Sequence, residues 1–325
     1  DRPNPNKPPV VSNASAAVAS GQSATIALTA SDADNNPLTV RIVSQPKGGT
    51  VALSRTTATY RANPDFEGAD QFTYAAWDGA IDSNLGKVTV TVTAKERPVL
   101  TAQGVTNAAS FEPGLAPGLL TTIFGSGMGP AVLAPGRFLS GGFMRKELAS
   151  TRVLFNGVAA PLVYVSGGLL TAVAPYSLAG STQASVVIEY AGIRSAPVTV
   201  PVAPVAPGVF TANATGKGPV LNLSSDPVTP GAAVVLYVTG EGATAPPGVD
   251  GKLAVVPLPQ PMQPISVRIG GKDAQVLYSG GAPGLVAGVM QLNVVVPPDL
   301  SPGTVTLVVL SGTVESQPGV TLEVR

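Results

Sequence analysis

The chain has 325 residues, with 19 basic and 19 acidic side chains and neither histidine nor cysteine. Histidine is the commonest general base and metal ligand, and cysteine supplies soft nucleophiles, disulfides and most structural zinc ligands. Their absence excludes Ser-His-Asp and Cys-His catalysis, zinc sites and iron–sulfur clusters, and it leaves carboxylate hydrolysis, a lysine nucleophile and oxygen-ligated Ca²⁺. The balanced charge provides no electrostatic footprint for nucleic acid or an anionic membrane.

Charged residues make up 12% of the chain and apolar residues 44%, and 37 glycines and 32 prolines separate short β-branched runs. This composition is typical of short strands joined by tight turns around real cores. No apolar run reaches the roughly 18–20 residues of a transmembrane helix, although the mean hydropathy is +0.31. Two explanations of that value stay open: surface buried against other copies, or large sandwich cores with Ala, Gly and Pro loops.

Residues 1–9, DRPNPNKPP, form a proline-rich leader that cannot join a central strand. From Val10 to about Ala94, apolar and polar residues alternate in short runs separated by turn sequences. The runs are ATIALTA, LTVRIV, GTVAL, ATYRA, QFTYAAW and KVTVTVTA. This spacing predicts a β-sandwich over residues 10–97, followed by a charged linker around Lys95 to Pro98.

The rest of the chain contains an internal duplication. PGLLTTIFGSG begins at Pro117 and PGAAVVLYVTGEG at Pro230, an offset of 113 (230 minus 117). VLFNG and VRIGG, VSGG and YSGG, and TAVAP and NVVVP continue the match, the last pair after an insertion of about nine residues, APGLVAGVM. The duplication predicts two further sandwiches, at 98–205 and 206–325, joined near the proline-rich segment 201–208. FLSGGFMRKELAS, with two glycines and poor periodicity, is predicted as a turn or short strand rather than a helix. The expected fold is all-β, with three tandem Ig-like β-sandwich domains.

The first domain resembles the cadherin-like and Ig-like repeats of large bacterial surface proteins. The matching strings are SDADNNPLTV, KGGTVAL, ATYRANPDFEGADQFTYAAWDG and VTVTVTA. The remainder resembles a β-rich C-terminal domain of exported proteins of Solibacter and other acidobacteria, through TNAASFEPGLAPGLLTTIFGSG, VLFNGVAAPLVYVSGG and APGLVAGVMQLNVVVP. Each half also resembles an IPT/TIG-type Ig fold, although the first copy lacks the Q-x-N pair of the second. The resemblances imply an extracellular spacer or adhesive module.

Acidic turns in the first domain are candidate calcium sites. Asp32, Asp34 and Asn36 lie in one turn, with Asn35, and Asp78 lies in another, near Asp82. Ca²⁺ takes six to eight oxygens from carboxylates, amides and carbonyls, and D-x-D-N-N supplies several in one loop. Cadherin-like repeats use such loops at domain junctions. The alternative is that these side chains only shape turns by accepting hydrogen bonds from backbone N–H groups.

Other polar or aromatic residues indicate structure more than chemistry. Gln291 and Asn293 share one strand face, where they could recognise a sugar or bond the inserted loop. Tyr74 and Trp77 are three apart, so one should be core and the other exposed. GSGMG lacks the lysine and helix of a phosphate loop. Asn13, Asn213 and Asn222 begin N-x-S/T triplets, which are weak glycosylation signals.

These observations predict a non-enzymatic extracellular structural protein with no required cofactor. The chain begins at Asp1 rather than Met, so we expect that an export signal has been removed. The favoured role is a subunit that polymerises with copies of itself, head to tail, into a surface filament or layer. The alternative is an adhesin that binds glycan or another surface through its loops.

The leader is the predicted assembly element. An extended segment can add a strand to the exposed sheet edge of a neighbouring sandwich. The leader's prolines lower the ordering cost of such a segment, and two valines after them could fill apolar pockets. The residues assigned to this role are Pro3, Pro5, Pro8, Pro9, Val10 and Val11. The competing explanation is that the leader folds back on its own domain.

Overall fold

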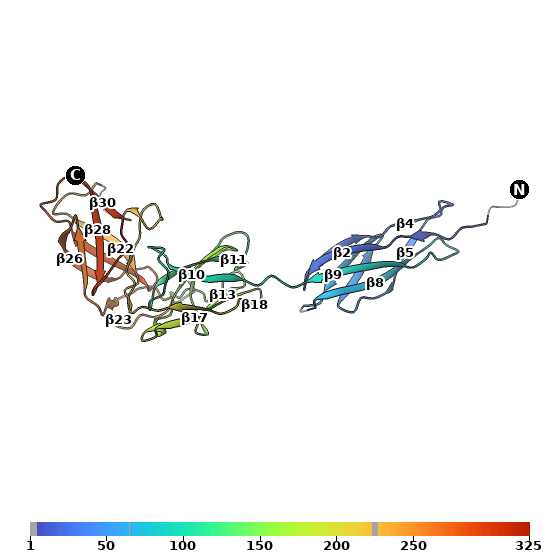
Figure 1. The fold of residues 1–325 in the computed structure, drawn as a ribbon, viewed down its shortest axis with the longest axis horizontal. Helices are drawn as coiled ribbons and strands as arrows, with labels where there is room; N and C mark the ends of the chain where they lie inside the picture. Colours follow the sequence, from blue (N-terminus) through green and yellow to red (C-terminus); the bar gives the residue numbers. More distant parts are fainter. Residues whose placement is uncertain (1–4, 65, 223–226) are drawn as a thin grey trace. The chain divides into compact units, whose positions relative to one another are not determined.

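The computed structural model describes residues 5–64, 66–222 and 227–325. These residues form strands, turns and loops with one short 3₁₀ helix, η1 (Tyr176–Leu178), so the all-β prediction is confirmed. The chain divides into two compact units, Asp1–Glu96 (unit 1) and Arg97–Arg325 (unit 2) (Figure 1). Among the described residues, no helix is long and apolar enough to span a bilayer.

Unit 1 contains the strands β1 (Val10–Val11), β2 (Ala14–Ala19), β3 (Ser23–Ala27), β4 (Ala30–Ser31), β5 (Thr39–Ser44), β6 (Gly49–Ser54), β7 (Thr57–Ala62), β8 (Gly68–Trp77) and β9 (Gly86–Thr93). They form a four-stranded sheet in the order β2-β9-β8-β5 and a three-stranded sheet in the order β3-β7-β6, with β1 paired to β4. All pairs are antiparallel except β2 with β9.

The core of unit 1 lies between its two sheets, because the alternation of side chains turns one face of each strand inward. In β7 exposed and buried positions alternate without a break. Tyr60, Phe72 and Tyr74 are fully buried, whereas Trp77 is half-exposed, as its odd spacing from Tyr74 predicts. The structure therefore agrees with one sandwich for this part of the chain.

Unit 2 contains two further sandwiches, referred to here as its first half and second half. The strands of the first half are β10 (Val99–Asn107), β11 (Leu120–Ser126), β12 (Ala134–Pro135), β13 (Thr151–Phe155), β14 (Val158–Ala159), β15 (Leu162–Val165), β16 (Leu169–Val173), β17 (Gln183–Tyr190), β18 (Ile193–Arg194) and β19 (Val198–Pro201). The strands of the second half are β20 (Gly208–Val209), β21 (Gly218–Pro219), β22 (Ala233–Thr239), β23 (Thr244–Ala245), β24 (Gln260–Pro261), β25 (Ile265–Ile269), β26 (Lys272–Gly281), β27 (Val289–Val295), β28 (Gly303–Ser311), β29 (Val314–Glu315) and β30 (Val320–Val324).

The duplication is visible in the strand pairing of the two halves. β11 pairs with β16, and β13 pairs with β17, in the first half. β22 pairs with β27, and β25 pairs with β28, in the second. Each half encloses its own hydrophobic core.

The two halves differ where a proline interrupts a strand. β26 runs without a break from Lys272 to Gly281, whereas its counterpart is split into β14 and β15 around Pro161. Pro161 aligns with Gln275 at the offset of 114 seen nearby (275 minus 161). Proline has no N–H to give to a sheet ladder, which accounts for the interruption. As a result, the first half forms two separate sheets. The second half forms one nine-stranded sheet, in which β29 branches from β28, and a separate β23–β24 pair.

Candidate functional site

The first candidate site is the acidic turn that contains Asp32. One Asp32 carboxylate oxygen accepts hydrogen bonds from the backbone N–H groups of Asp34, at 2.8 Å, and Asn36, at 3.1 Å. This local pattern holds the turn in shape, as Asp side chains commonly do. The other oxygen of Asp32 is buried without a hydrogen-bond partner.

The leader lies across this turn. The Asn6 amide donates to Asp78 at 2.8 Å and its oxygen accepts from the Asn36 amide at 2.6 Å. The backbone N–H of Lys7 donates to Asp34 at 2.7 Å. The structure therefore brings Asp34, Asn36 and Asp78 onto one short stretch of leader.

The donor set of this site suits Ca²⁺ in type, because carboxylates and amide oxygens are what that ion prefers. In the described residues, however, no three Asp or Glu side chains are grouped so as to hold a metal ion. The carboxylates instead accept N–H groups. Hydrogen bonds from the backbone of Ile81 and Ala80, and then from Asn6, lower the pKa of Asp78. Calcium binding through Asp32, Asp34, Asn36 and Asp78 stays a prediction.

Pro9 at the end of the leader and Val11 just after it belong to the fold of unit 1, which corrects part of the assembly prediction. Pro9 is buried, and Val11 is 4% exposed in the core. The Val11 backbone exchanges two hydrogen bonds with the Asn84 side chain, both at 2.9 Å. Val11 therefore fills its own core, not a neighbour's pocket. Pro5, Pro8 and Val10 are exposed, and Pro3 lies outside the described residues.

In unit 2, the inserted segment 282–290 joins the two halves. Ala282, Val286 and Val289 pack with Leu120 and Val173 of the first half in one apolar cluster, which also includes Met144. The insertion has no counterpart in the first copy, so only the second copy can supply this contact.

A buried threonine connects the same two halves. The Thr239 hydroxyl donates to the carbonyl of Gly288 at 2.7 Å and accepts the backbone N–H of Leu120 at 2.9 Å. At Gly288 an added Cβ would lie 2.1 Å from the carbonyl oxygen of Gly118, so glycine is required for this approach. The halves are therefore held by paired polar groups as well as by apolar contact.

Glu241 is the most unusual titratable group of unit 2. It is 4% exposed, one of its oxygens accepts the Tyr176 hydroxyl at 3.2 Å, and its other oxygen is buried without a partner. Burial raises the pKa of Glu241, whereas hydrogen bonds from its own backbone N–H and from the Tyr176 hydroxyl lower it. The effect of burial is larger, so the pKa is about 7. Glu241 aligns with Met128 (241 minus 128 is 113), which is a fully buried core residue. Comparison of the two copies could have shown that this glutamate is buried.

Tyr176, from η1 of the first half, reaches Glu241 because glycines leave space for its ring. A Cβ on Gly118 or Gly248 would lie 2.5 or 2.2 Å from the ring. Asp250 accepts the Tyr176 backbone N–H at 2.9 Å. This arrangement places a carboxyl group with a raised pKa in the junction between the halves.

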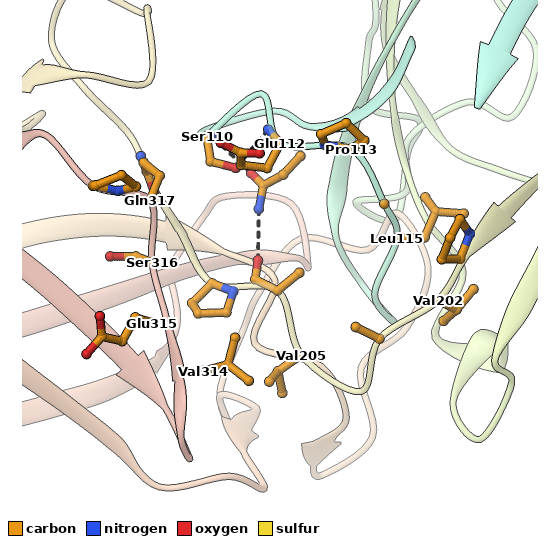
Figure 2. Close-up of a pocket in the computed structure, with 17 residues that line it drawn as sticks. Ser110, Glu112, Pro113, Leu115, Val202, Val205, Val314, Glu315, Ser316 and Gln317 are labelled. Atoms are coloured by element: carbon orange, nitrogen blue, oxygen red, sulfur yellow. Dashed lines mark hydrogen bonds between the residues drawn. The ribbon is translucent and has the colours of Figure 1, made fainter. Parts of the chain in front are cut away.

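A cleft of about 430 Å³ also lies between the two halves (Figure 2). Figure 2 shows Ser110 and Glu112 on one side and Glu315, Ser316 and Gln317 on the other. The buried amides that line it are already used: Asn107 donates to Ala206 at 2.8 Å, and Gln317 donates to Val209 at 2.6 Å. The remaining lining is mostly proline, valine and leucine, and it contains no nucleophile–base pair. The cleft offers apolar contact and carboxylates.

The Q-x-N pair of the second half does not bond the inserted loop. The Gln291 amide instead donates to the Asn293 oxygen at 2.9 Å. The predicted shared face is confirmed, and the expected contact with the loop backbone is replaced by this mutual hydrogen bond.

Comparison with known families gives a match within unit 1. Residues 6–93 match the family model of a bacterial Ig domain. This match covers the first domain only, so the resemblance of residues 100–325 to acidobacterial exported domains stays a prediction. No match was found among curated proteins.

Several solved structures are similar to the chain over most of its length. An I-band fragment of titin is 11% identical, covers 98% of this chain and 99% of its own, and has a TM-score of 0.24. SGBP-B of the Bacteroides ovatus mixed-linkage glucan utilization locus, in complex with a mixed-linkage heptasaccharide, is 12% identical over 99% of this chain and 71% of its own, with a TM-score of 0.29. A protocadherin gammaB7 cis-dimer is 14% identical over 98% and 74%, with a TM-score of 0.26.

Proposed function

We propose that the chain is a non-enzymatic extracellular structural protein whose copies join head to tail into a surface filament or layer. The observation that carries this proposal is the exposure of large apolar side chains on a chain with few charges. Val132 and Val256 are 81% and 85% exposed, and Leu85, Val10 and Met262 are also well exposed. These side chains offer apolar area that a neighbouring copy can bury, and low charge offers little resistance to association.

The interior supports a structural role. The three cores are filled with apolar side chains, and the Thr239 hydroxyl in the junction of unit 2 bonds the backbone of both halves. The one cleft described in Figure 2 is lined without a catalytic pair. Pro5 and Pro8 of the leader, and Val10 of β1, are exposed and remain available to a neighbour.

Electron microscopy of the purified chain, with and without residues 1–8, tests this function. We expect filaments or sheets from the full chain and fewer or none from the truncated chain, which keeps the buried Pro9 and Val11. A full chain that stays monomeric at high concentration would contradict the proposal.

An adhesin is the second candidate, and a hollow on unit 1 favours it. This hollow of about 510 Å³ is lined by side chains suited to a sugar: Gln45, Gln71, Thr73, Lys47, Lys87 and Phe66. Amides, hydroxyls and one aromatic ring are the groups that bind sugars through hydrogen bonds and stacking. A glycan array with monomeric protein tests it: saturable binding that is lost in Gln71→Ala, but retained in Arg55→Ala, would support the adhesin.

A further inference from the structure

Two equivalent loops of the duplication meet on unit 2. One connects β11 to β13 and the other connects β22 to β25, so both follow the same strand of their copy. The backbone N–H of Met144 donates to Gly251, and that of Leu253 donates to Gly142, both at 2.8 Å. The duplication therefore joins two surface loops into one continuous surface.

The joined loops expose apolar side chains, which we call the loop platform. Its members are Phe138, Leu139, Phe143, Val249, Val255 and Val256, each at least 40% exposed. Phe143 forms a β-bridge with Lys252, and Lys252 lies in one shallow pocket with Val249, Val255 and Val256. Exposed apolar residues that gather in this way are typical of an interaction surface.

Cations surround the loop platform. They are Arg137, Arg145, Lys146 and Lys252, and none of them forms an ion pair within the part of the chain that the structure describes. The Lys252 ammonium lies 6.0 Å from the centre of the Phe143 ring. Two carboxylates, Glu147 and Asp250, lie in the same loops. The platform is therefore apolar with a net positive rim.

Unit 1 carries a surface of the opposite charge, which we call the acidic tip. Val10, Trp77, Ile81 and Leu85 are exposed there. Its carboxylates are Asp32, Asp34, Asp78 and Asp82, against the cations Lys7 and Arg41. Hydrogen bonds from Asn6 to Asp78 and from Val11 to Asn84, and a β-bridge from Trp77 to Asp82, show that these segments adjoin.

We infer that the loop platform of one copy docks on the acidic tip of a second copy. This inference rests on the proposed head-to-tail assembly and names its two surfaces. Each surface offers apolar side chains for burial, and the opposite net charges favour this pairing over platform-to-platform or tip-to-tip contact. Because the two surfaces differ, the contact is heterologous. Each added copy still has one unoccupied surface, to which a further copy can bind.

An anionic membrane is the other class of partner that a basic apolar surface can meet. The structure favours a second copy for two reasons. Glu147 and Asp250 within the platform would be repelled by anionic lipid, and the complementary acidic surface is carried by the same chain.

Charge reversal on each surface tests the inference with the full chain. The platform variant carries Arg145→Glu and Lys146→Glu, and the tip variant carries Asp34→Lys and Asp82→Lys. The control variant, Arg55→Glu with Lys217→Glu, reverses two exposed cations outside both surfaces. Each variant is first checked for a wild-type β spectrum and a cooperative melt.

Assembly is measured by pelleting and electron microscopy without added divalent cations. We expect each surface variant to raise the critical concentration at least tenfold and the control to leave it unchanged. An equal mixture of the platform and tip variants should assemble again, because every junction in an alternating polymer is then complementary.

The outcomes separate the two proposals. A wild-type chain that stays monomeric contradicts the proposed function. Wild-type filaments that both surface variants still form overturn the inference and leave the function standing. Flotation of monomeric wild-type chain with phosphatidylglycerol vesicles, lost in the platform variant, would assign the platform to a membrane and also overturn the inference.

Discussion

Two buried carboxylates, Asp70 in unit 1 and Glu241 in unit 2, respond to their surroundings in opposite directions. Burial alone would raise the pKa of Asp70, but the Tyr60 hydroxyl at 2.8 Å and three backbone N–H groups outweigh it, and the pKa is lowered. Glu241 has only the Tyr176 hydroxyl and its own backbone, so burial prevails and its pKa rises. The number of donors around each carboxylate decides the sign.

The stability of unit 2 should therefore fall as the pH rises. A pKa of about 7 against an ordinary 4.5 makes the folded state bind the proton more tightly than the unfolded chain. The stabilisation is complete below about pH 4.5, is lost up to about pH 7, and amounts to about 3 kcal/mol. Calorimetry of the full chain from about pH 4 to 8 measures it.

Glu241→Gln should remove this dependence and be more stable than the wild type at pH 8, while Glu112→Gln, an exposed control in the same unit, should keep it. Tyr176, which bonds Glu241, should not replace it, because burial, with Glu241 nearby, raises the Tyr176 pKa further above neutrality. Equal pH profiles for Glu241→Gln and the wild type would contradict this account of the junction.

Asp70→Asn should destabilise unit 1 by about 2–4 kcal/mol at pH 7, because the new amide has one acceptor oxygen for four donors. The wild type should also lose this stabilisation as the pH falls through the lowered pKa of Asp70, below its ordinary 3.8. Chemical denaturation, followed by the fluorescence of Trp77, reports on unit 1. A loss no larger than that of the exposed control Glu67→Gln would show that the network is unimportant.

At the scale of elements, the alternating strands were predictable and the weakly apolar ones were not. The runs that predicted β3 and β5 through β9 all combine β-branched or aromatic residues with period-two alternation. β2, with the sequence ASAAVA, lacks that signal and forms because β9 offers a parallel partner. Pairing of this kind is tertiary and does not show in a local pattern.

The inserted segment illustrates the same limit. Its presence was evident from the repeat spacing, but its contact with Leu120, Val173 and Thr239 depends on how the two halves meet. Likewise, the linker 201–208 was identified by its prolines, yet the backbone N–H of Ala206 bonds Gly240 in the junction. Sequence spacing locates such segments, and only the packed structure assigns their partners.

Thr239→Val tests the junction between the halves. Valine has nearly the same shape but leaves the Leu120 N–H and the Gly288 carbonyl unpaired in a buried site. We expect unit 2 to lose about 2–4 kcal/mol. Denaturation of Thr239→Val beside Thr304→Val, an exposed control, measures the difference. Equal stabilities of the two variants would mean that the hydroxyl does not hold the halves together.

The acidic turns make the calcium prediction testable at the same scale. If Ca²⁺ binds at Asp32, Asp34, Asn36 and Asp78, adding it should raise the melting temperature of unit 1, and chelator should reverse the change. Asp32→Ala with Asp34→Ala should abolish the response, whereas Asp273→Ala in unit 2 should retain it. A melting temperature that is insensitive to both calcium and chelator would exclude the site.

At the scale of the whole molecule, the duplication explains the architecture of unit 2 and the origin of the loop platform. It supplies two halves with matching strand pairs, and it brings two equivalent loops together as the loop platform. The fold class and the repeat followed from periodicity and spacing. The loop platform could not be predicted in this way, because neither loop has a distinctive sequence. The two loops form an apolar surface only where they adjoin in the folded chain.

Cryo-electron microscopy of the purified full-length chain tests the central claim most directly. The account predicts polymers in which each copy makes one repeated contact, with the loop platform of one copy against the acidic tip of the next. Particles that remain single copies at all accessible concentrations, with both surfaces facing solvent, would contradict it.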